Sequence, residues 1–245
     1  PPEFLLTHPL SSSRISDAFN AAEGVSEEGT KRDSLDFGFM KARLEVYYEN
    51  IPLNSLRLFE SKMDQNPSDA NIYGLALAHE KNNNFDESLA LLNKLIQKYP
   101  KNLVINNTKV DVLLSYEKFD AALALVNKFL EISPKNYPLS ISKSKILLAM
   151  EKYFKSEEIV RDQILRKNDD PELWLLLSEI QRNSQNIVGY HQSRAEYFLL
   201  LGQDEKALNQ LEFALQLTQN NFQVSESIMT KIVEIKKELS GSRGL

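Results

Sequence analysis

Cysteine is absent from the 245 residues of this sequence. Its absence excludes disulfide bridges, thiol catalysis and metal sites built on thiolates. Long apolar runs are missing too: stretches such as Trp174–Leu177 and Phe198–Leu201 contain four residues, whereas a helix that spans a membrane needs about 20. A surplus of basic residues is also lacking, because the formal net charge is −5 and nucleic-acid-binding proteins usually carry a basic stripe. We therefore expect neither a membrane span nor a nucleic-acid partner.

What the sequence does contain is an internal repeat. Many residues recur identically 34 positions further along the chain, and nine of them have their first copies at Phe85, Asp86, Leu89, Leu91, Asn93, Lys94, Pro100, Lys101 and Asn102. A second shift by the same period carries Leu113, Leu114, Glu117, Lys118 and Val126 onto identical residues. Such self-similarity is typical of repeat arrays, in which each unit buries its apolar face only against its neighbours.

Each repeat is predicted to contain two helices. After Phe119 the apolar residues follow at offsets 3, 4, 7, 10 and 11, namely Ala122, Leu123, Val126, Phe129 and Leu130. This spacing predicts one amphipathic helix, and Pro134 ends it. An earlier helix is marked by Val110, Leu113 and Leu114. The sequence therefore predicts an all-α protein built as an α-solenoid of helical hairpins.

The period and the placement of small residues resemble the tetratricopeptide repeat (TPR) family. Members of this family have small residues where the two helices cross, because a larger side chain would overpack the crossing. Ala76, Ser88 and Ala122 are such residues here. We expect repeat units at 36–67, 68–102, 103–136, 137–170 and 188–220. A helix at 171–183 is expected to pair irregularly with the segment that follows it. A C-terminal helix at 222–239 is expected to cap the solenoid, which fills 34–245.

Residues 1–33 do not repeat, and they carry a second resemblance. Pro1 to Pro9 reads Pro-Pro-Glu-Phe-Leu-Leu-Thr-His-Pro, and Arg14 follows. This motif, together with Phe39–Arg43, resembles the HtpX-like zinc metallopeptidases and among them the periplasmic BepA-like proteases. The resemblance implies that residues 1–33 are the end of an upstream protease domain and a linker, and that the chain is a piece of a longer protein.

The resemblance also implies an activity for the parent protein. Its protease domain would hold zinc through a His-Glu-x-x-His helix, and its TPR domain would contact the outer-membrane assembly machinery or unfolded outer-membrane proteins in the periplasm. His8 is a candidate ligand of that zinc, because a neutral imidazole can take the place of the zinc-bound water. The alternative for His8 is a residue that packs against the end of the protease domain.

No catalytic motif is complete within the 245 residues of the chain. The closest string, His79-Glu80-Lys81-Asn82-Asn83, has Asn where a zinc helix needs its second His. We therefore expect no cofactor and no catalytic residue in this chain. Two functions remain open, the interaction domain of a zinc metalloprotease and a free-standing TPR adaptor without protease activity.

Partner-binding residues are predicted from the helix positions that face the concave side of TPR arrays. They are Met40, Leu44, Tyr47, Tyr73, Leu77, Asn107, Asp111, Ile141 and Lys145. TPR domains that clamp a C-terminal carboxylate place Lys and Asn where Met40 and Leu44 stand, so this specificity is disfavoured. A groove lined by apolar and aromatic groups suits an extended or unfolded segment. The alternative for Tyr47 and Tyr73 is packing in the core between repeats.

Overall fold

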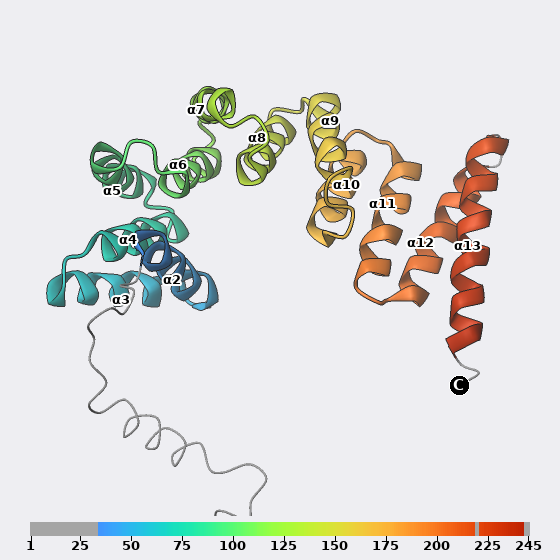
Figure 1. Ribbon diagram of the computed structural model, residues 1–245, viewed down its shortest axis with the longest axis horizontal. Helices are drawn as coiled ribbons and strands as arrows, with labels where there is room; N and C mark the ends of the chain where they lie inside the picture. The colour runs from blue at the N-terminus through green and yellow to red at the C-terminus, as the bar shows by residue number, and fades with distance from the viewer. Residues whose placement is uncertain (1–33, 219–220, 243–245) are drawn as a thin grey trace, which may run out of the picture.

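The computed structural model describes residues 34–218 and 221–242, and the described chain consists of twelve helices without a strand (Figure 1). In chain order the helices are α2 (Leu35–Tyr48), α3 (Pro52–Gln65), α4 (Asp69–Lys81), α5 (Phe85–Lys98), α6 (Leu103–Ser115), α7 (Phe119–Ile132), α8 (Tyr137–Ala149), α9 (Tyr153–Ile164), α10 (Pro171–Asn183), α11 (Ile187–Leu200), α12 (Asp204–Leu217) and α13 (Phe222–Ser242). The predicted all-α solenoid is confirmed. Within the described residues, no helix combines the length and the hydrophobicity that crossing a membrane requires.

The repeat period of the sequence governs where helices begin. The first helices of successive hairpins, α4, α6, α8 and α10, start exactly one period apart in the chain, and so do their partners α5, α7, α9 and α11. A polar residue precedes each first helix, and its side-chain oxygen accepts a hydrogen bond from a backbone N–H of the first turn. These residues are Ser68, Asn102, Asn136 and Asp170. Because such a cap contributes about 1 kcal/mol, the repeat fixes helix starts through local chemistry.

The turn inside each hairpin repeats as well. Asn83, Glu117, Glu151 and Gln185 follow one another at the same period, and each has a backbone φ between 57° and 62°. This left-handed conformation lets the chain reverse within a short turn between two helices. It is uncommon for residues other than glycine, so each turn stores a small amount of backbone strain.

The array changes phase at α11. Gly202, at φ 66°, makes the same kind of turn between α11 and α12, but it follows Gln185 by half a repeat. Helix α11 therefore pairs with α10 through one turn and with α12 through the next. The irregular pairing expected for the helix at 171–183 is not observed, because α10 pairs with α11 in phase with the earlier hairpins. The irregular element is α11, which also pairs with α12, as in the expected unit at 188–220.

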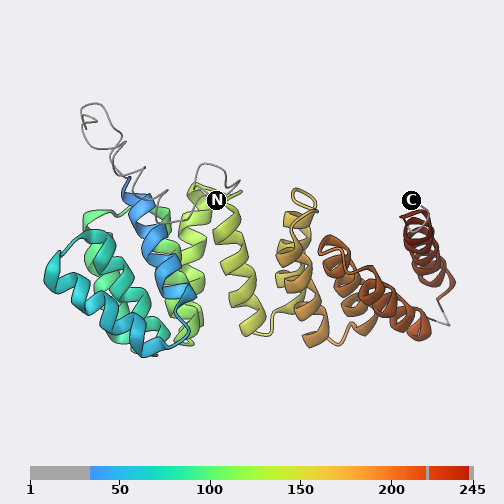
Figure 2. The same ribbon diagram turned by 90° about the horizontal axis from the view of Figure 1, so that it is seen from below.

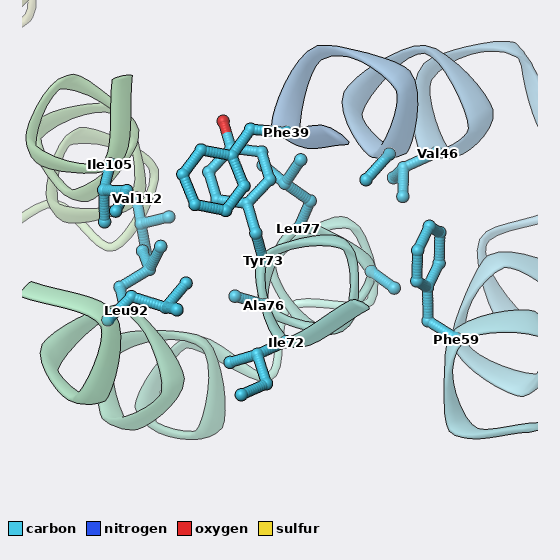
Figure 3. Close-up of a cluster of buried hydrophobic side chains, with 13 residues drawn as sticks. Phe39, Val46, Phe59, Ile72, Tyr73, Ala76, Leu77, Leu92, Ile105 and Val112 are labelled. Atoms are coloured by element: carbon cyan, nitrogen blue, oxygen red, sulfur yellow. The ribbon is translucent and has the colours of Figure 1, made fainter. Parts of the chain in front are cut away.

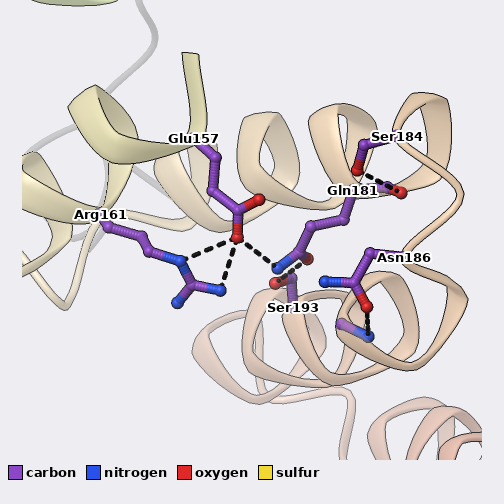
Figure 4. A network of polar contacts seen from close by, with 7 residues as sticks. Glu157, Arg161, Gln181, Ser184, Asn186 and Ser193 are labelled. Atoms are coloured by element: carbon purple, nitrogen blue, oxygen red, sulfur yellow. Dashed lines mark hydrogen bonds and ion pairs between the residues drawn. The ribbon is translucent and has the colours of Figure 1, made fainter. Parts of the chain in front are cut away.

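A partly buried polar network joins the helices on either side of this phase change (Figure 4). The Glu157 carboxylate of α9 accepts hydrogen bonds from Arg161 and, at 3.2 Å, from the Gln181 amide of α10. The Ser193 hydroxyl of α11 donates a hydrogen bond to the side-chain oxygen Oε1 of Gln181 at 2.7 Å. Gln181 is buried, and since both ends of its amide are paired, the network fixes how α9, α10 and α11 meet.

The helices follow one another along an arch from α2 to α13 in Figure 1, and they stand in a row in the perpendicular view of Figure 2. In Figure 1, α6 and α8 lie on its inner side, whereas α7 lies on its outer side. Four hydrophobic clusters fill the arch in sequence, and they are centred on α2–α6, α6–α8, α8–α10 and α11–α13. The core is thus a chain of interfaces between neighbours.

The first unit departs from the expected hairpin, because α2 and α3 each pack against α4. Figure 3 shows Phe39 and Val46 of α2 and Phe59 of α3 converging on α4. Close approach requires small residues on the helix faces that meet. A Cβ at Gly74 would lie 2.0 Å from the Phe59 ring, and a Cβ at Gly38 would lie 3.1 Å from Cβ of Ala70.

Candidate partner-binding surface

A pocket of about 380 Å³ opens between α2, α6 and the start of α8. Its walls are mostly apolar, whereas an arginine and two asparagines supply polar groups; the lining residues are Met40, Arg43, Leu103, Val104, Asn107, Asn136 and Pro138. We call it the α2–α6 pocket. Apolar walls with a few placed polar groups are typical of binding sites in proteins.

One polar cluster fixes the arginine of this pocket. Nη2 of Arg43 donates hydrogen bonds to the Tyr73 hydroxyl and to Oγ1 of Thr108, both at 2.6 Å. The Tyr73 and Thr108 hydroxyls are themselves 2.7 Å apart. Burial raises the pKa of the Tyr73 hydroxyl, although the nearby positive charge of Arg43 opposes that shift. The cluster therefore joins α2, α4 and α6 and holds the Arg43 guanidinium in a fixed orientation.

A second polar cluster joins α6 to α8. The Ser142 hydroxyl lies 2.8 Å from Oδ1 of Asp111 and 3.1 Å from Oδ1 of Asn107, and the Asn107 amide donates to Oδ2 of Asp111 at 3.2 Å. Burial raises the pKa of the Asp111 carboxyl, while the Ser142 hydrogen bond and the positive charges of Arg43 and Lys145 act in the opposite direction. The carboxylate thus lies close enough to Arg43 to compensate part of its charge.

The predicted partner-binding residues fall into separate groups. Met40 and Asn107 line the α2–α6 pocket, and Asp111 contacts Asn107 beside it. Ile141 and Lys145 line a second, smaller pocket of about 180 Å³ between α8 and α10. The structure therefore brings together part of the predicted set, and it spreads that set over two neighbouring pockets.

Two further predicted residues lie on α2 beyond the first pocket. The side chains of Leu44 and Tyr47 are 53% and 73% exposed. They are exposed, but neither of them lines a pocket described above, so their role as partner-binding residues stays a prediction.

Two predicted residues are corrected. Tyr73 and Leu77 are 0% and 8% exposed and belong to the hydrophobic cluster of α2–α6. Helix α2 lies directly against α4 and covers the side of α4 that carries them. Tyr73 is therefore a residue of the core between repeats, the alternative considered for it above, and neither side chain is available to a partner.

Sequence reasoning missed Arg43 as a pocket residue. Arg43 lies one repeat period before Leu77, which itself lies one period before Asp111. Extending the period backwards from Leu77 would have found it. The prediction began the first unit one residue late and so selected Leu44. Ser142 and Asn136 carry no such signal, because their roles depend on how α8 approaches α6.

Residues 34–218 and 221–242 contain no candidate metal site, because no three His, Asp or Glu side chains among them lie together as metal ligands would. Nδ1 of His79 lies 3.4 Å from the Asn84 amide, which agrees with a structural role for this histidine. The candidate zinc ligand His8 lies outside the described residues.

Comparison with known proteins identifies the repeat. A sequence model of the tetratricopeptide repeat matches residues 113–180, the span from the end of α6 to α10. The match and the regular succession of hairpins show that the chain contains TPR repeats. TPR solenoids present extended surfaces to other proteins, so this is a protein-interaction domain.

Curated relatives carry the name β-barrel assembly-enhancing protease. That of Yersinia pestis is 35% identical over 121 residues, which are 48% of this chain and 25% of the relative. That of Escherichia coli K12 is 28% identical over 217 residues, which are 87% of this chain and 44% of the relative. The chain therefore spans less than half the length of these relatives.

Solved structures with similar folds share little sequence with this chain. MamA from Desulfovibrio magneticus aligns with a TM-score of 0.49 and 12% identity over 69% of this chain and 96% of that one. A TPR protein from Thermus thermophilus aligns with a TM-score of 0.48 and 17% identity over 82% of this chain and 100% of that one.

Proposed function

We propose that this chain is the interaction domain of a zinc metalloprotease that acts in the assembly and quality control of outer-membrane β-barrel proteins in the periplasm. The similarity to β-barrel assembly-enhancing proteases over 87% of the chain supports the link to a protease. The observation that carries the interaction role is the α2–α6 pocket, which lies between first helices of the array.

The pocket suits an internal, extended segment of a polypeptide. Met40, Leu103 and Val104 offer apolar walls for a side chain of the segment. Arg43 and Asn107 offer hydrogen-bond donors for its backbone carbonyl groups. Arg43 is already bound to two hydroxyl groups, and Asp111 compensates part of its charge. A free C-terminal carboxylate therefore gains less here than it would beside an uncompensated cation.

Photo-crosslinking in cells tests the interaction role. A photoreactive amino acid replaces Asn107 in the pocket or, as a control, Ile132, which is 75% exposed on the outer helix α7. The protein is produced in its natural full length and irradiated, and the crosslinked products are identified. We expect outer-membrane β-barrel proteins or their assembly factors to crosslink from position 107 and not from 132. Identical products from both positions, or none of these proteins, would refute the proposal.

The protease link needs its own test. The full-length protein, purified with its bound metal, is mixed with an unfolded outer-membrane β-barrel protein. We expect cleavage that stops when a chelator removes zinc and resumes when zinc is restored. A full-length protein that binds the substrate at the pocket but never cleaves it would be a TPR adaptor without protease activity.

A further inference from the structure

Helix α2 is apolar on two sides. Phe39, Ala42 and Val46 are buried and face α4. Phe37, Leu44, Tyr47 and Tyr48 lie on another side and are 52%, 53%, 73% and 73% exposed. With 3.6 residues per turn, the centres of the two sides are separated by roughly 170° around the helix axis, so they lie on nearly opposite faces. We call the four exposed residues the α2 stripe.

In the rest of the array, a preceding helix packs against each first helix. Helix α6 is packed against α5, α8 against α7 and α10 against α9, so each first helix touches the helix that precedes it in the chain. For α2, the first described helix, no predecessor lies within residues 34–218 and 221–242. Terminal helices of solenoids normally turn a polar face to solvent. The α2 stripe is apolar instead, which indicates that something covers it.

We propose that residues 15–22 of the same chain dock on the α2 stripe. Their sequence carries Ile15, Ala18, Phe19 and Ala22 at offsets 0, 3, 4 and 7, the spacing of one apolar helix face. The residues themselves lie outside the described part of the chain. By the order seen in the array, the segment just before α2 is the one that packs against it, and this segment brings a matching apolar pattern.

Reach and tethering favour this segment over a second copy of the chain. Twelve residues, 23–34, separate it from α2 and can span up to about 40–43 Å. Helix α2 has 14 residues, which correspond to a length of about 21 Å, so every position of the stripe is accessible. A short linker also holds the segment at an effective concentration of the order of millimolar. A second copy would compete only at comparable protein concentrations.

The absence of cysteine allows a clean accessibility measurement, which does not depend on what the α2–α6 pocket binds. Leu44→Cys places the only thiol of the 245 residues in the stripe, and its rate of reaction with a maleimide is measured. We expect the double substitution Ile15→Asp, Phe19→Asp to accelerate labelling at least tenfold, because it detaches the segment. Ile132→Cys on α7 serves as the matched control, and its labelling rate should stay the same. Equal rates at position 44 with and without the double substitution would overturn the proposal.

A disulfide measurement identifies the occupant. The pair Phe19→Cys, Leu44→Cys is oxidised in the otherwise unchanged chain, and the control pair is Phe19→Cys, Ile132→Cys. We expect a bond within one molecule for the first pair, with monomer mobility on a non-reducing gel, and little bonding for the control. Disulfides only between two molecules would show that a second copy covers the stripe and would overturn the proposal. Equal bonding of the two pairs would overturn it as well.

Discussion

At the scale of single residues, the contact between α3 and α4 depends on the absence of one methyl group. A Cβ at Gly74 would lie within 2.4 Å of three atoms of the buried Phe59 ring. We predict that Gly74→Ala lowers the free energy of unfolding by up to about 2 kcal/mol, because overpacking costs about 1–3 kcal/mol and the better helix propensity of alanine returns about 1 kcal/mol. Urea denaturation measures the change.

The smaller side chain of a Phe59→Leu variant provides the control for this prediction. In that background, Gly74→Ala should cost less than in the natural sequence, because a leucine leaves more room beside position 74. If Gly74→Ala lowers the free energy of unfolding equally in both backgrounds, the Phe59 ring is not the group that excludes a side chain here.

The buried carboxyl group of Asp111 makes stability depend on pH. Burial raises its pKa in the folded protein above the ordinary value of 3.8. The folded state therefore holds this proton more tightly than the unfolded state, so stability decreases as pH rises from the ordinary pKa through the raised one. We predict that the free energy of unfolding of Asp111→Asn, relative to the natural protein, increases over this pH window. Urea denaturation between pH 4 and pH 7.5 measures it, and a difference that is constant with pH would contradict the prediction.

How much of the site the sequence could predict also depends on single residues. Asn107 and Asp111 follow from the period, since they repeat the positions of Tyr73 and Leu77. In the first unit, a start one residue late turned the predicted set by about 100° around the helix axis and replaced Arg43 by Leu44. The burial of Tyr73 could not be predicted, because it depends on α2 lying across α4.

At the scale of elements, the hairpin turns carry a strain that can be relieved. Glu117 has a backbone φ of 57°, and this conformation costs a residue with a Cβ about 1–2 kcal/mol. We predict that Glu117→Gly raises the free energy of unfolding, by up to about 1 kcal/mol, because glycine also loses more entropy on folding. In contrast, Glu158→Gly in the interior of α9 should lower it by about 1 kcal/mol. Urea denaturation of both variants measures the changes, and destabilisation of similar size by both substitutions would contradict the strained turn.

The helices themselves were largely predictable. Caps, prolines and apolar spacing are local signals, and they recur with the period of the repeat. The shared role of α11 was less visible, because both possible partners fit its sequence: the spacing of Ile187 continues the earlier repeat, whereas Ala195, Gly202 and Ala207 fit a unit that starts anew. Only the packing shows that both pairings occur in the same molecule.

At the scale of the whole molecule, the separate hydrophobic clusters should allow parts of the array to unfold independently. Ile228 is buried in the cluster of α11–α13, whereas Trp174, the single tryptophan, lies on α10 and packs against another cluster. In a repeat array each unit is stabilised mainly by its neighbours. We predict that Ile228→Ala, which costs about 2–5 kcal/mol locally, moves the far-ultraviolet circular dichroism transition to lower urea and leaves the Trp174 fluorescence transition nearly unchanged. A common shift of both signals would show that the arch unfolds as one unit.

The central claim is that the α2–α6 pocket of the arch binds an extended polypeptide. Leu103→Asp places a charge at the wall of the pocket in the first turn of α6, and Phe154→Asp places the same charge in the first turn of α9, where Phe154 is 83% exposed. Both acids stand near a helix N-terminus, where a negative charge is tolerated. The dissociation constant of a fluorescently labelled, unfolded outer-membrane β-barrel protein is measured for both variants of the full chain. The pocket predicts an increase of at least tenfold for Leu103→Asp and a change within twofold for Phe154→Asp, whereas equal affinities of the two variants would contradict it.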